Sequence, residues 1–388
     1  MSSIVLVSGT RADYGIYLPV AKQLRADGWD VSFLLTGMHL LTSHGNSANI
    51  VREDGFSVLS EVPSIWGDDT RANMGRSTAR ELSGFLDVLE PNSADWLMLL
   101  GDRGEMIAGA LAGLYLGIPT AHLHGGEVSG SLDEPIRHAI SKLSSLHFPA
   151  TEDARRRLLR LGENDSRIFK VGAPRLDTIL SEPLPNWESV VNKYELGTLK
   201  TNQYVLLMFH PVSTEVECAR KQTQAVVEAC LRLELPIICI GPNADAGFSD
   251  VLGVYVDLLL QRKEATFHLV MNFEPMDYLC VLKNCKLLVG NSSSGIIEAA
   301  SYHVPVVNIG SRQRGRDRSS NVIDVQGESD ELTKACNRAM SVEFRSQIGP
   351  NVYGDGHAAA RISEVLQGIN DRSWWSSKQD SDLSLGLR

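Results

Sequence analysis

Residues 96–122 read WLMLLGDRGEMIAGALAGLYLGIPTAH, and this stretch decides the fold. The apolar run at 96–100 predicts a strand, the glycine-containing residues 101–105 predict a loop, and the alanine-rich run at 106–116 predicts a helix. Residues 119–122 then lead, as the next strand, into the loop around 124–127. A strand that is apolar throughout is typical of a parallel sheet covered by helices on both faces. The stretch therefore predicts an α/β fold.

The same alternation continues in both directions along the chain. Further apolar strands are predicted at 4–8, 29–36, 205–209, 236–240, 267–270, 287–289 and 304–309. A loop, GTRADYG at 9–15, and a helix at 16–27 follow the first of them. SEPLPNWE at 181–188 contains two prolines, which favour an extended connector. We therefore expect an N-terminal domain at 1–180 and a C-terminal domain at 189–356, with a ligand cleft between them.

The composition narrows the classes of function. The 388 residues carry a formal charge of -10, with 43% hydrophobic and 22% charged residues, which is typical of a globular protein. The acidic balance argues against general nucleic-acid binding, and no apolar run approaches the roughly 20 residues that a membrane helix needs. The six cysteines form no CxxC pair, and the first residues lack a signal-peptide pattern. We therefore expect reduced thiols and a cytoplasmic location.

A serine-rich loop, NSSSG at 291–295, lies between a predicted strand and an apolar helix predicted at 296–302. The start of a helix presents free backbone N–H groups and the positive end of the helix dipole. Ser293 and Ser294 can donate to phosphate oxygens there, and Gly295 permits close approach of the backbone. The alternative is a plain serine N-cap. The loop is not a Walker motif, because no Gly-Lys-Ser/Thr follows with the required spacing.

Cationic groups follow other strands and could also bind an anion. Arg11 lies in the loop at 9–15, and His210 lies in FHP at 209–211. The alternative for Arg11 is an ordinary surface arginine, and the alternative for His210 is a structural turn. Four arginines crowd a loop after the strand at 304–309, and they suit either a polyanion or a solvated loop with acidic neighbours. They are Arg312, Arg314, Arg316 and Arg318.

Three carboxylates follow predicted strands or begin a predicted helix. Asp102 lies beside Arg103, Glu127 ends HLHGGE at 122–127, and Glu134 follows Asp133 at the start of a helix. Burial and neighbouring charge can tune such groups for proton transfer. The alternative for each is a helix cap or a salt bridge, and Asp133 in particular fits an N-cap. The histidines at 122 and 124 belong to no set with tetrahedral zinc spacing, so we expect no metal.

Taken together and in order, these motifs resemble the hydrolysing UDP-N-acetylglucosamine 2-epimerases, which supply N-acetylmannosamine for sialic-acid-type sugars. The resemblance is carried by GTRADYG (9–15), TGMHL (36–40), GDR (101–103), HGGEVSGSLDEPIRHAISKLS (124–144), FHP (209–211), FEPMDYL (273–279), GNSSSGIIEAA (290–300) and NIGSRQRGRDRSSNVI (308–323). It implies two Rossmann-like domains of the glycosyltransferase-B type, with the active-site cleft between them. It also implies a C-terminal helix, at 357–375, that packs back on the first domain.

The resemblance implies a reaction without a cofactor. The nucleotide is eliminated across C1–C2 of the sugar to give a 2-acetamidoglucal, which is then hydrated with the opposite configuration at C2. By resemblance, the phosphates are contacted by Arg11, His210, Ser293, Ser294 and Gly295, the ribose by Glu298, and the base by the backbone around Phe273. The sugar side is lined by Asp102, Arg103, Glu127 and Glu134. Spacing does not assign the base and the acid among these carboxylates.

Two other functions remain open at this point. A glycosyltransferase of the same fold would need an acceptor, and an inactive nucleotide-sugar-binding regulator would have no need for several carboxylates. The substrate is also open among UDP-N-acetylglucosamine, UDP-linked 2,4-diacetamido-trideoxy sugars and a GDP-linked amino sugar. We expect a homo-oligomer, either a dimer or a tetramer.

Overall fold

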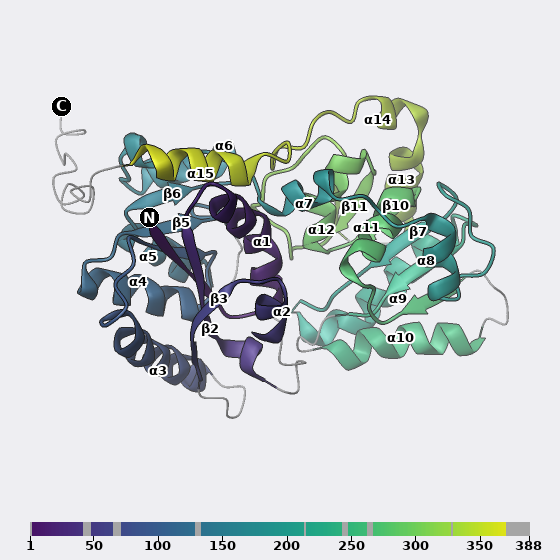
Figure 1. Ribbon diagram of the computed structural model, residues 1–388. Coiled ribbons are helices and arrows are strands. Elements are labelled where there is room, and N and C mark those ends of the chain that lie inside the picture. The colour runs from purple at the N-terminus through teal and green to yellow at the C-terminus, as the bar shows by residue number, and fades with distance from the viewer. Residues whose placement is uncertain are drawn as a thin grey trace, which may run out of the picture. The chain divides into compact units, whose positions relative to one another are not determined.

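Two six-stranded sheets, one in each of two units of the chain, form the framework of the protein (Figure 1). The computed structural model describes residues 2–41, 48–64, 71–128, 133–212, 215–242, 247–261, 267–326 and 329–369. Unit 1 comprises Met1–Thr178 and the segment from Tyr353 onward, and unit 2 comprises Ile179–Val352.

The sheet of unit 1 has the strand order β3-β2-β1-β4-β5-β6, with parallel pairing throughout. Its strands are β1 (Ser3–Ser8), β2 (Asp30–Thr36), β3 (Ser57–Val62), β4 (Trp96–Leu100), β5 (Thr120–Leu123) and β6 (Leu146–Phe148). Its helices are α1 (Arg11–Ala26), α2 (Ala48–Glu53), α3 (Arg71–Leu89), α4 (Gly104–Leu116), α5 (Asp133–Leu143), α6 (Glu152–Arg160) and α15 (Ala358–Gly368), with short 3-10 turns at Gly37–Leu40 and Asp165–Arg167. Helix α7 (Arg175–Ser181) begins in unit 1 and ends in unit 2. This is the strand order of a Rossmann fold, in which the chain changes direction between β1 and β4.

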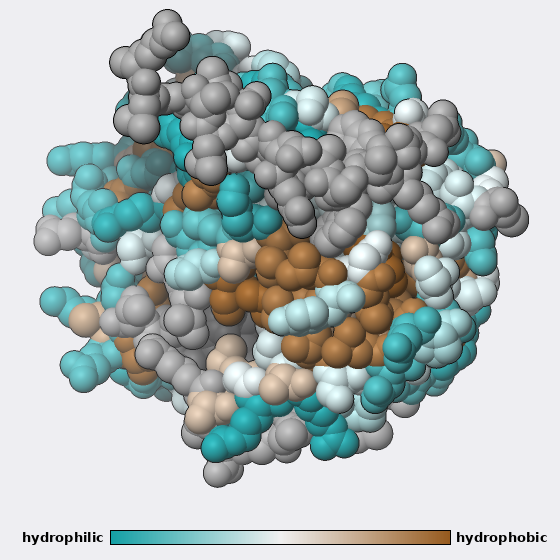
Figure 2. All heavy atoms as spheres, turned by 90° about the vertical axis from the view of Figure 1, so that its left-hand side faces the viewer, coloured by the Kyte–Doolittle hydropathy of each residue, from teal (hydrophilic) through white to brown (hydrophobic). Residues whose placement is uncertain are grey.

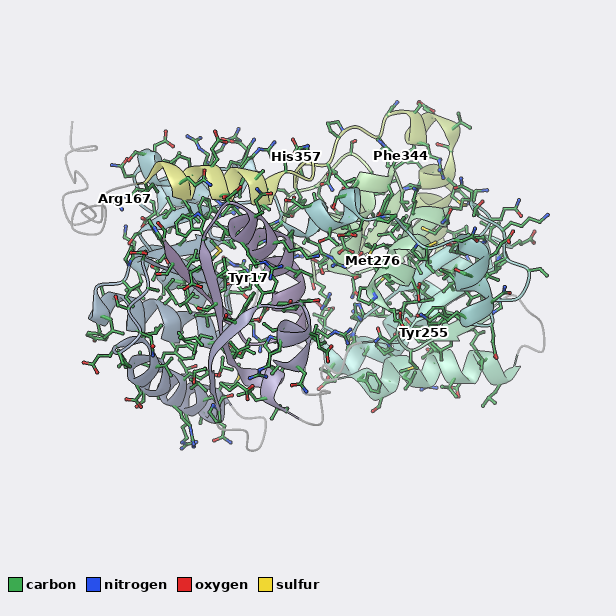
Figure 3. All side chains as sticks on the ribbon, viewed as in Figure 1. Tyr17, Arg167, Tyr255, Met276, Phe344 and His357 are labelled. Atoms are coloured by element: carbon green, nitrogen blue, oxygen red, sulfur yellow. The ribbon has the colours of Figure 1, made fainter. Side chains whose placement is uncertain are left out.

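Both faces of this sheet are buried, which explains why its strands are apolar throughout. Ile4 and Leu6 of β1 face a core that α1, α2 and α15 complete, whereas Val5 and Val7 face a core completed by α3, α4 and α5. Tyr17 of α1 is fully buried in the first core and donates its hydroxyl to the Met98 carbonyl of β4 at 3.1 Å (Figure 3).

The C-terminal helix α15 packs on α1 in unit 1. Ile362 and Leu366 are buried in the same core as Tyr17. The Asp177 carboxylate caps the start of α15 by accepting from the Ala358 and Ala359 N–H groups at 3.0 and 2.7 Å. The segment from Tyr353 onward therefore returns to the unit that holds the N-terminus.

The sheet of unit 2 repeats this topology, with the order β12-β11-β10-β7-β8-β9 and parallel pairing. Its strands are β7 (Val205–Met208), β8 (Ile237–Ile240), β9 (Phe267–Val270), β10 (Leu287–Gly290), β11 (Val306–Ile309) and β12 (Val322–Val325). Its helices are α8 (Trp187–Lys193), α9 (Ala219–Leu231), α10 (Phe248–Gln261), α11 (Pro275–Asn284), α12 (Ser293–Ile297), α13 (Ser329–Met340) and α14 (Val342–Ser346), with 3-10 turns at Val216–Cys218 and Ala299–Tyr302. The direction changes between β7 and β10. The predicted α/β class with two Rossmann-like domains is confirmed.

The prediction of a loop at 9–15 was wrong, because α1 already begins at Arg11. The Thr10 side chain accepts from the Asp13 N–H at 3.1 Å and caps the helix, which therefore starts five residues earlier than predicted. The two prolines of the predicted connector lie between α7 and α8, whereas Trp187 and Glu188 belong to α8. Within the described ranges, no helix is both long and apolar enough to cross a membrane.

Candidate active site

The residues singled out in the sequence follow the carboxyl ends of strands in both sheets. In open parallel sheets, ligands bind outside these ends where the strand order reverses. That point lies between β1 and β4 in unit 1 and between β7 and β10 in unit 2.

In unit 1, Asp102 follows β4 and forms an ion pair with Arg137 of α5. The Arg137 side chain is 5% exposed and that of Asp102 is 20% exposed, so the pair is largely removed from water. The Arg137 guanidinium therefore holds the Asp102 carboxylate in place through a charge-assisted contact. The sequence did not predict this partner, but the pair joins the Asp102 loop to the helix that carries Glu134.

His122 also holds the loop that contains Asp102. Its ring is fully buried, with Nε2 2.7 Å from the Gly101 carbonyl and Nδ1 3.0 Å from the Ser141 hydroxyl. These partners assign the proton to Nε2, which donates to the carbonyl, and Nδ1 accepts from the hydroxyl. Burial lowers the pKa of His122 to about 3, so the ring is neutral. With both nitrogens occupied, His122 serves to hold the loop rather than a metal.

Glu127 and His124 form a pair at the end of β5. His124 Nδ1 lies 2.6 Å from Glu127 Oε1, and both side chains are mostly buried. His124 adopts a left-handed backbone conformation, with φ of 59°, which is uncommon for a residue other than glycine. Glu134 lies one turn before His138 on α5, with 3.8 Å between its Oε1 and His138 Nε2. Each predicted glutamate therefore has a histidine beside it.

A cluster of carboxyl groups that the sequence analysis missed surrounds Arg103. Arg103 pairs with Glu105 of α4 at 3.1 Å. Burial raises the pKa of Asp13 to about 6 and that of Glu81 to about 8, and the charge of Glu105 contributes to both. Glu81 lies in the middle of α3 and carries no sequence signal, since only the tertiary fold brings it here. Arg11, in contrast, is exposed at the first position of α1.

In unit 2, Asn291 joins the loops that follow β7 and β10. Its fully buried side chain accepts from the His210 N–H and donates to the His210 carbonyl, both at 2.8 Å. Tyr255 of α10 contacts the same loop by donating to the Phe209 carbonyl at 3.4 Å (Figure 3). The backbone at His210 is therefore fixed, although the sequence analysis gave Asn291 no role.

The serine-rich segment lies at a strand-to-helix junction, as predicted, but α12 begins at Ser293 and not at 296, and it ends at Ile297 before a 3-10 turn. The Ser292 hydroxyl accepts from the Ser294 N–H at 3.3 Å and forms the N-cap. The Ser294 hydroxyl is held by the Glu298 carboxylate and the Tyr278 hydroxyl, so the structure brings Ser294 and Glu298 together. Ser293 is half-buried. At Gly295 an added methyl group would approach Val306 and Leu288 at 3.0 and 3.2 Å, so this glycine lets α12 lie close to the sheet.

The side chain of Phe273 belongs to the core of unit 2. It is 6% exposed and packs on Tyr194 with 4.4 Å between ring centroids. Arg312 donates to the Asn291 carbonyl at 3.1 Å and Arg318 pairs with Asp324, so these two arginines have protein partners. Among the described residues, no group of three or more His, Cys, Asp or Glu side chains is arranged to hold a metal ion.

The sequence and the fold match those of known proteins along most of the chain. The family profile described as UDP-N-acetylglucosamine 2-epimerase matches residues 22–367. A Legionella pneumophila protein named UDP-N,N'-diacetylbacillosamine 2-epimerase (hydrolyzing) is 40% identical over 371 residues, which are 94% of this chain and 96% of that protein. A UDP-N-acetylglucosamine 2-epimerase of Neisseria meningitidis is 33% identical over 393 residues and covers 100% of both chains.

The crystal structure of a Neisseria meningitidis UDP-GlcNAc 2-epimerase bound to UDP-GlcNAc has the same fold, with a TM-score of 0.77 over 95% of this chain and 100% of that one, at 19% identity. The profile match and the two relatives each span most of this sequence. The chain therefore belongs to the UDP-N-acetylglucosamine 2-epimerase family.

Proposed function

We propose that the protein is a hydrolysing nucleotide-sugar 2-epimerase that releases a free manno-configured sugar and UDP. The observation that carries the proposal is the set of carboxylates after β4, after β5 and at the start of α5, in a chain of this family. They are Asp102, Glu127 and Glu134. A protein that only binds a nucleotide sugar has no need for this set.

The chemistry requires both proton transfer and stabilisation of a leaving group. The C2 proton of an N-acetylhexosamine has no adjacent carbonyl, so its direct removal and return is difficult. In the proposed reaction a base takes that proton, the C1–O bond breaks, and UDP departs with the bonding electrons. Water then adds its hydroxyl to C1 of the glucal, and a proton reaches C2 from the opposite face. Positioned carboxylates and cations can serve these two steps.

The local environments support different roles for the three carboxylates. Asp102, paired with the largely buried Arg137, suits electrostatic stabilisation. Glu127, at 2.6 Å from an imidazole nitrogen, suits proton transfer because the histidine can take or return the proton. Glu134 has the same type of neighbour at a longer distance. We therefore propose Glu127 and Glu134 as the proton-transfer groups, with Arg103 contacting the sugar side.

We propose that the nucleotide is held mainly by residues of unit 2. His210 and Ser293 lie at the ends of β7 and β10, and Asn291 fixes the backbone of the His210 loop. We assign these two residues to the phosphates together with Arg11, Ser294 and Gly295. Glu298 is assigned to the ribose and the backbone near Phe273 to the base. The Ser294–Glu298 bond would have to yield for both of its side chains to reach the ligand.

Two substrates are favoured by the names of relatives. The 40% identical relative is named for UDP-N,N'-diacetylbacillosamine, a 2,4-diacetamido-trideoxy sugar, and the 33% identical relative is named for UDP-N-acetylglucosamine. We propose the diacetamido sugar as the first candidate and UDP-N-acetylglucosamine as the second. Both react at C1 and C2, so the same mechanism applies to either.

The proposed function is tested by incubating the purified protein with each of these two UDP sugars in water, without any acceptor. Proton NMR is expected to show free manno-configured sugar, together with UDP, from one of them. A glycosyltransferase would leave both sugars intact until an acceptor is added. A regulator would bind a sugar nucleotide in calorimetry without turnover, and either result would contradict the proposal.

We also propose that two copies of the chain associate through α4. Residues 106–126 contain no charged side chain, and Leu114 and Tyr115 of α4 are 40% and 72% exposed. Figure 2 shows apolar side chains gathered in one patch on the side of the molecule that carries α4. An isolated apolar helix face favours burial against a partner.

The charges on the neighbouring helix α3 favour a second copy as that partner. Arg76 and Arg80 are exposed in its first half, and Asp87 is exposed near its end. In a two-fold dimer both copies use the same surface. If the basic half of one α3 faces the acidic half of the other, the symmetry therefore repeats this attractive contact in the opposite direction. Light scattering is expected to give twice the chain mass, and Leu114→Arg is expected to give the monomer mass. A monomeric unmodified protein would contradict the proposal.

A further inference from the structure

Glu105 lies at the point where the strand order of unit 1 reverses. It is in the first turn of α4, immediately after β4, and it is 6% exposed. The N-terminal turn of a helix favours a negative charge through its free N–H groups and dipole. The position therefore suits a carboxylate that is held in one place.

Three hydrogen bonds join Glu105 to Arg103. Arg103 Nε lies 3.3 Å from each carboxylate oxygen, and Nη2 lies 3.1 Å from Oε1. These bonds use one edge of the guanidinium and fix its plane. The Arg103 side chain remains 40% exposed, so its other edge, at Nη1, can face a ligand.

Two glycines leave the space that the Glu105 carboxylate occupies. A methyl group at Gly9, after β1, would lie 2.7 Å from Glu105 Oε1, and one at Gly37, after β2, would lie 2.8 Å from it. His39 N–H donates to the Gly9 carbonyl at 3.2 Å, which joins the same two strand ends. Glu105 therefore packs directly against the backbone of the loops after β1 and β2.

The charged neighbours of Glu105 come from every element around it. Asp13 of α1 and Glu81 of α3 are buried carboxyl groups, and Asp102 also faces Arg103. His39 is fully buried, and burial lowers its pKa to about 4, so it adds no positive charge near neutral pH. Without the bonds to Glu105, the Arg103 guanidinium could turn toward one of these other carboxyl groups and lose its orientation.

We infer that Glu105 is a positioning residue that holds the guanidinium of Arg103 in the orientation needed by the reaction. The inference rests on the proposed function, in which Arg103 contacts the sugar side of the substrate. Glu105 would act through Arg103 and would itself touch no reacting atom. The sequence GDRGE at 101–105 alone assigns no role to Glu105, since a carboxylate at this position could equally be a helix cap.

The test is a double-mutant cycle of Glu105→Gln and Arg103→Ala, measured by turnover of the UDP sugar. Glutamine keeps the shape of the side chain but not its charge. Glu105→Gln is expected to lower kcat by roughly 10-fold to 100-fold, because misplaced groups cost this much when geometry is critical. UDP affinity is expected to stay unchanged. In the Arg103→Ala background, the same substitution is expected to have no further effect. Glu90→Gln, at an exposed position after α3, is the matched control.

A second readout separates positioning from a general loss of structure. Since the charge of Glu105 raises the pKa of Asp13 and Glu81, Glu105→Gln is expected to move both titrations to lower pH, observed by NMR of the carboxyl carbons. Full turnover in Glu105→Gln, or an equal loss with and without Arg103, would overturn the inference. If the unmodified protein has no epimerase activity, the proposed function is wrong. In that case, unchanged titrations of Asp13 and Glu81 in Glu105→Gln would still show separately that the charge of Glu105 does not act on this cluster.

Discussion

Glu127→Gln is expected to lower turnover by roughly 10²-fold to 10⁴-fold, which is the usual contribution of a general acid or base. Glutamine keeps the size of the side chain and can still contact His124, but it cannot carry a proton to or from the sugar. Because Glu127 is not among the residues proposed to bind the nucleotide, UDP affinity is expected to change little. The measurements are steady-state turnover by NMR and UDP binding by calorimetry.

Glu134→Gln provides the parallel case on α5, with the same expected loss. Glu90→Gln controls for the removal of one surface charge and should retain full activity. If both Glu127→Gln and Glu134→Gln are fully active, these carboxylates are the wrong ones, even though the family membership stands. If both lose UDP affinity to the same extent as turnover, they act in binding rather than in proton transfer.

Gly290→Ala is expected to destabilise the protein by about 4 kcal/mol or more, at the upper end of single-substitution effects. Gly290 ends β10 with φ of 146°, a conformation that is almost restricted to glycine, and an added methyl group would overlap the Met208 carbonyl of β7. The two strands flank the proposed nucleotide loops, so neither can move aside without disturbing them. Urea unfolding followed by fluorescence measures the effect.

Gly310→Ala is the matched control for this substitution. Gly310 follows β11 with a positive φ of 72°, but an added methyl group there would meet no atom within 4 Å. Its cost is therefore only the backbone strain, about 1 kcal/mol. If the two variants lose equal stability, steric overlap with the Met208 carbonyl of β7 is not the cause of the loss in Gly290→Ala.

The strand and helix pattern was largely predictable from the sequence, because buried parallel strands are continuous apolar runs. The strand at Trp96–Leu100 was predicted with its observed bounds. Three strands were missed. The edge strands β3 and β12 contain polar, partly exposed residues, and β6 has only three residues, LHF. These strands are recognisable only beside the neighbours that they pair with.

The sequence was enough to predict which candidate residues follow strands. It was not enough to predict which side chains they contact. Asp102 and Glu127 follow strands, and that position alone identified them. Arg137, which pairs with Asp102, lies 35 residues further along the chain. Glu81 lies inside a helix, and its burial depends on packing that no local pattern encodes. Local sequence therefore indicated which groups lie at the ends of the sheet, and tertiary structure decides their charge and contacts.

The reaction carried out in heavy water tests elimination followed by hydration most directly. The sugar that turns over, whichever of the two UDP sugars it is, is incubated with the protein in heavy water, and the product is examined by proton NMR and mass spectrometry. If the C2 proton is lost and the glucal later takes a deuteron from solvent, the free manno-configured product carries deuterium at C2. A product that retains protium at C2 would contradict the proposed mechanism.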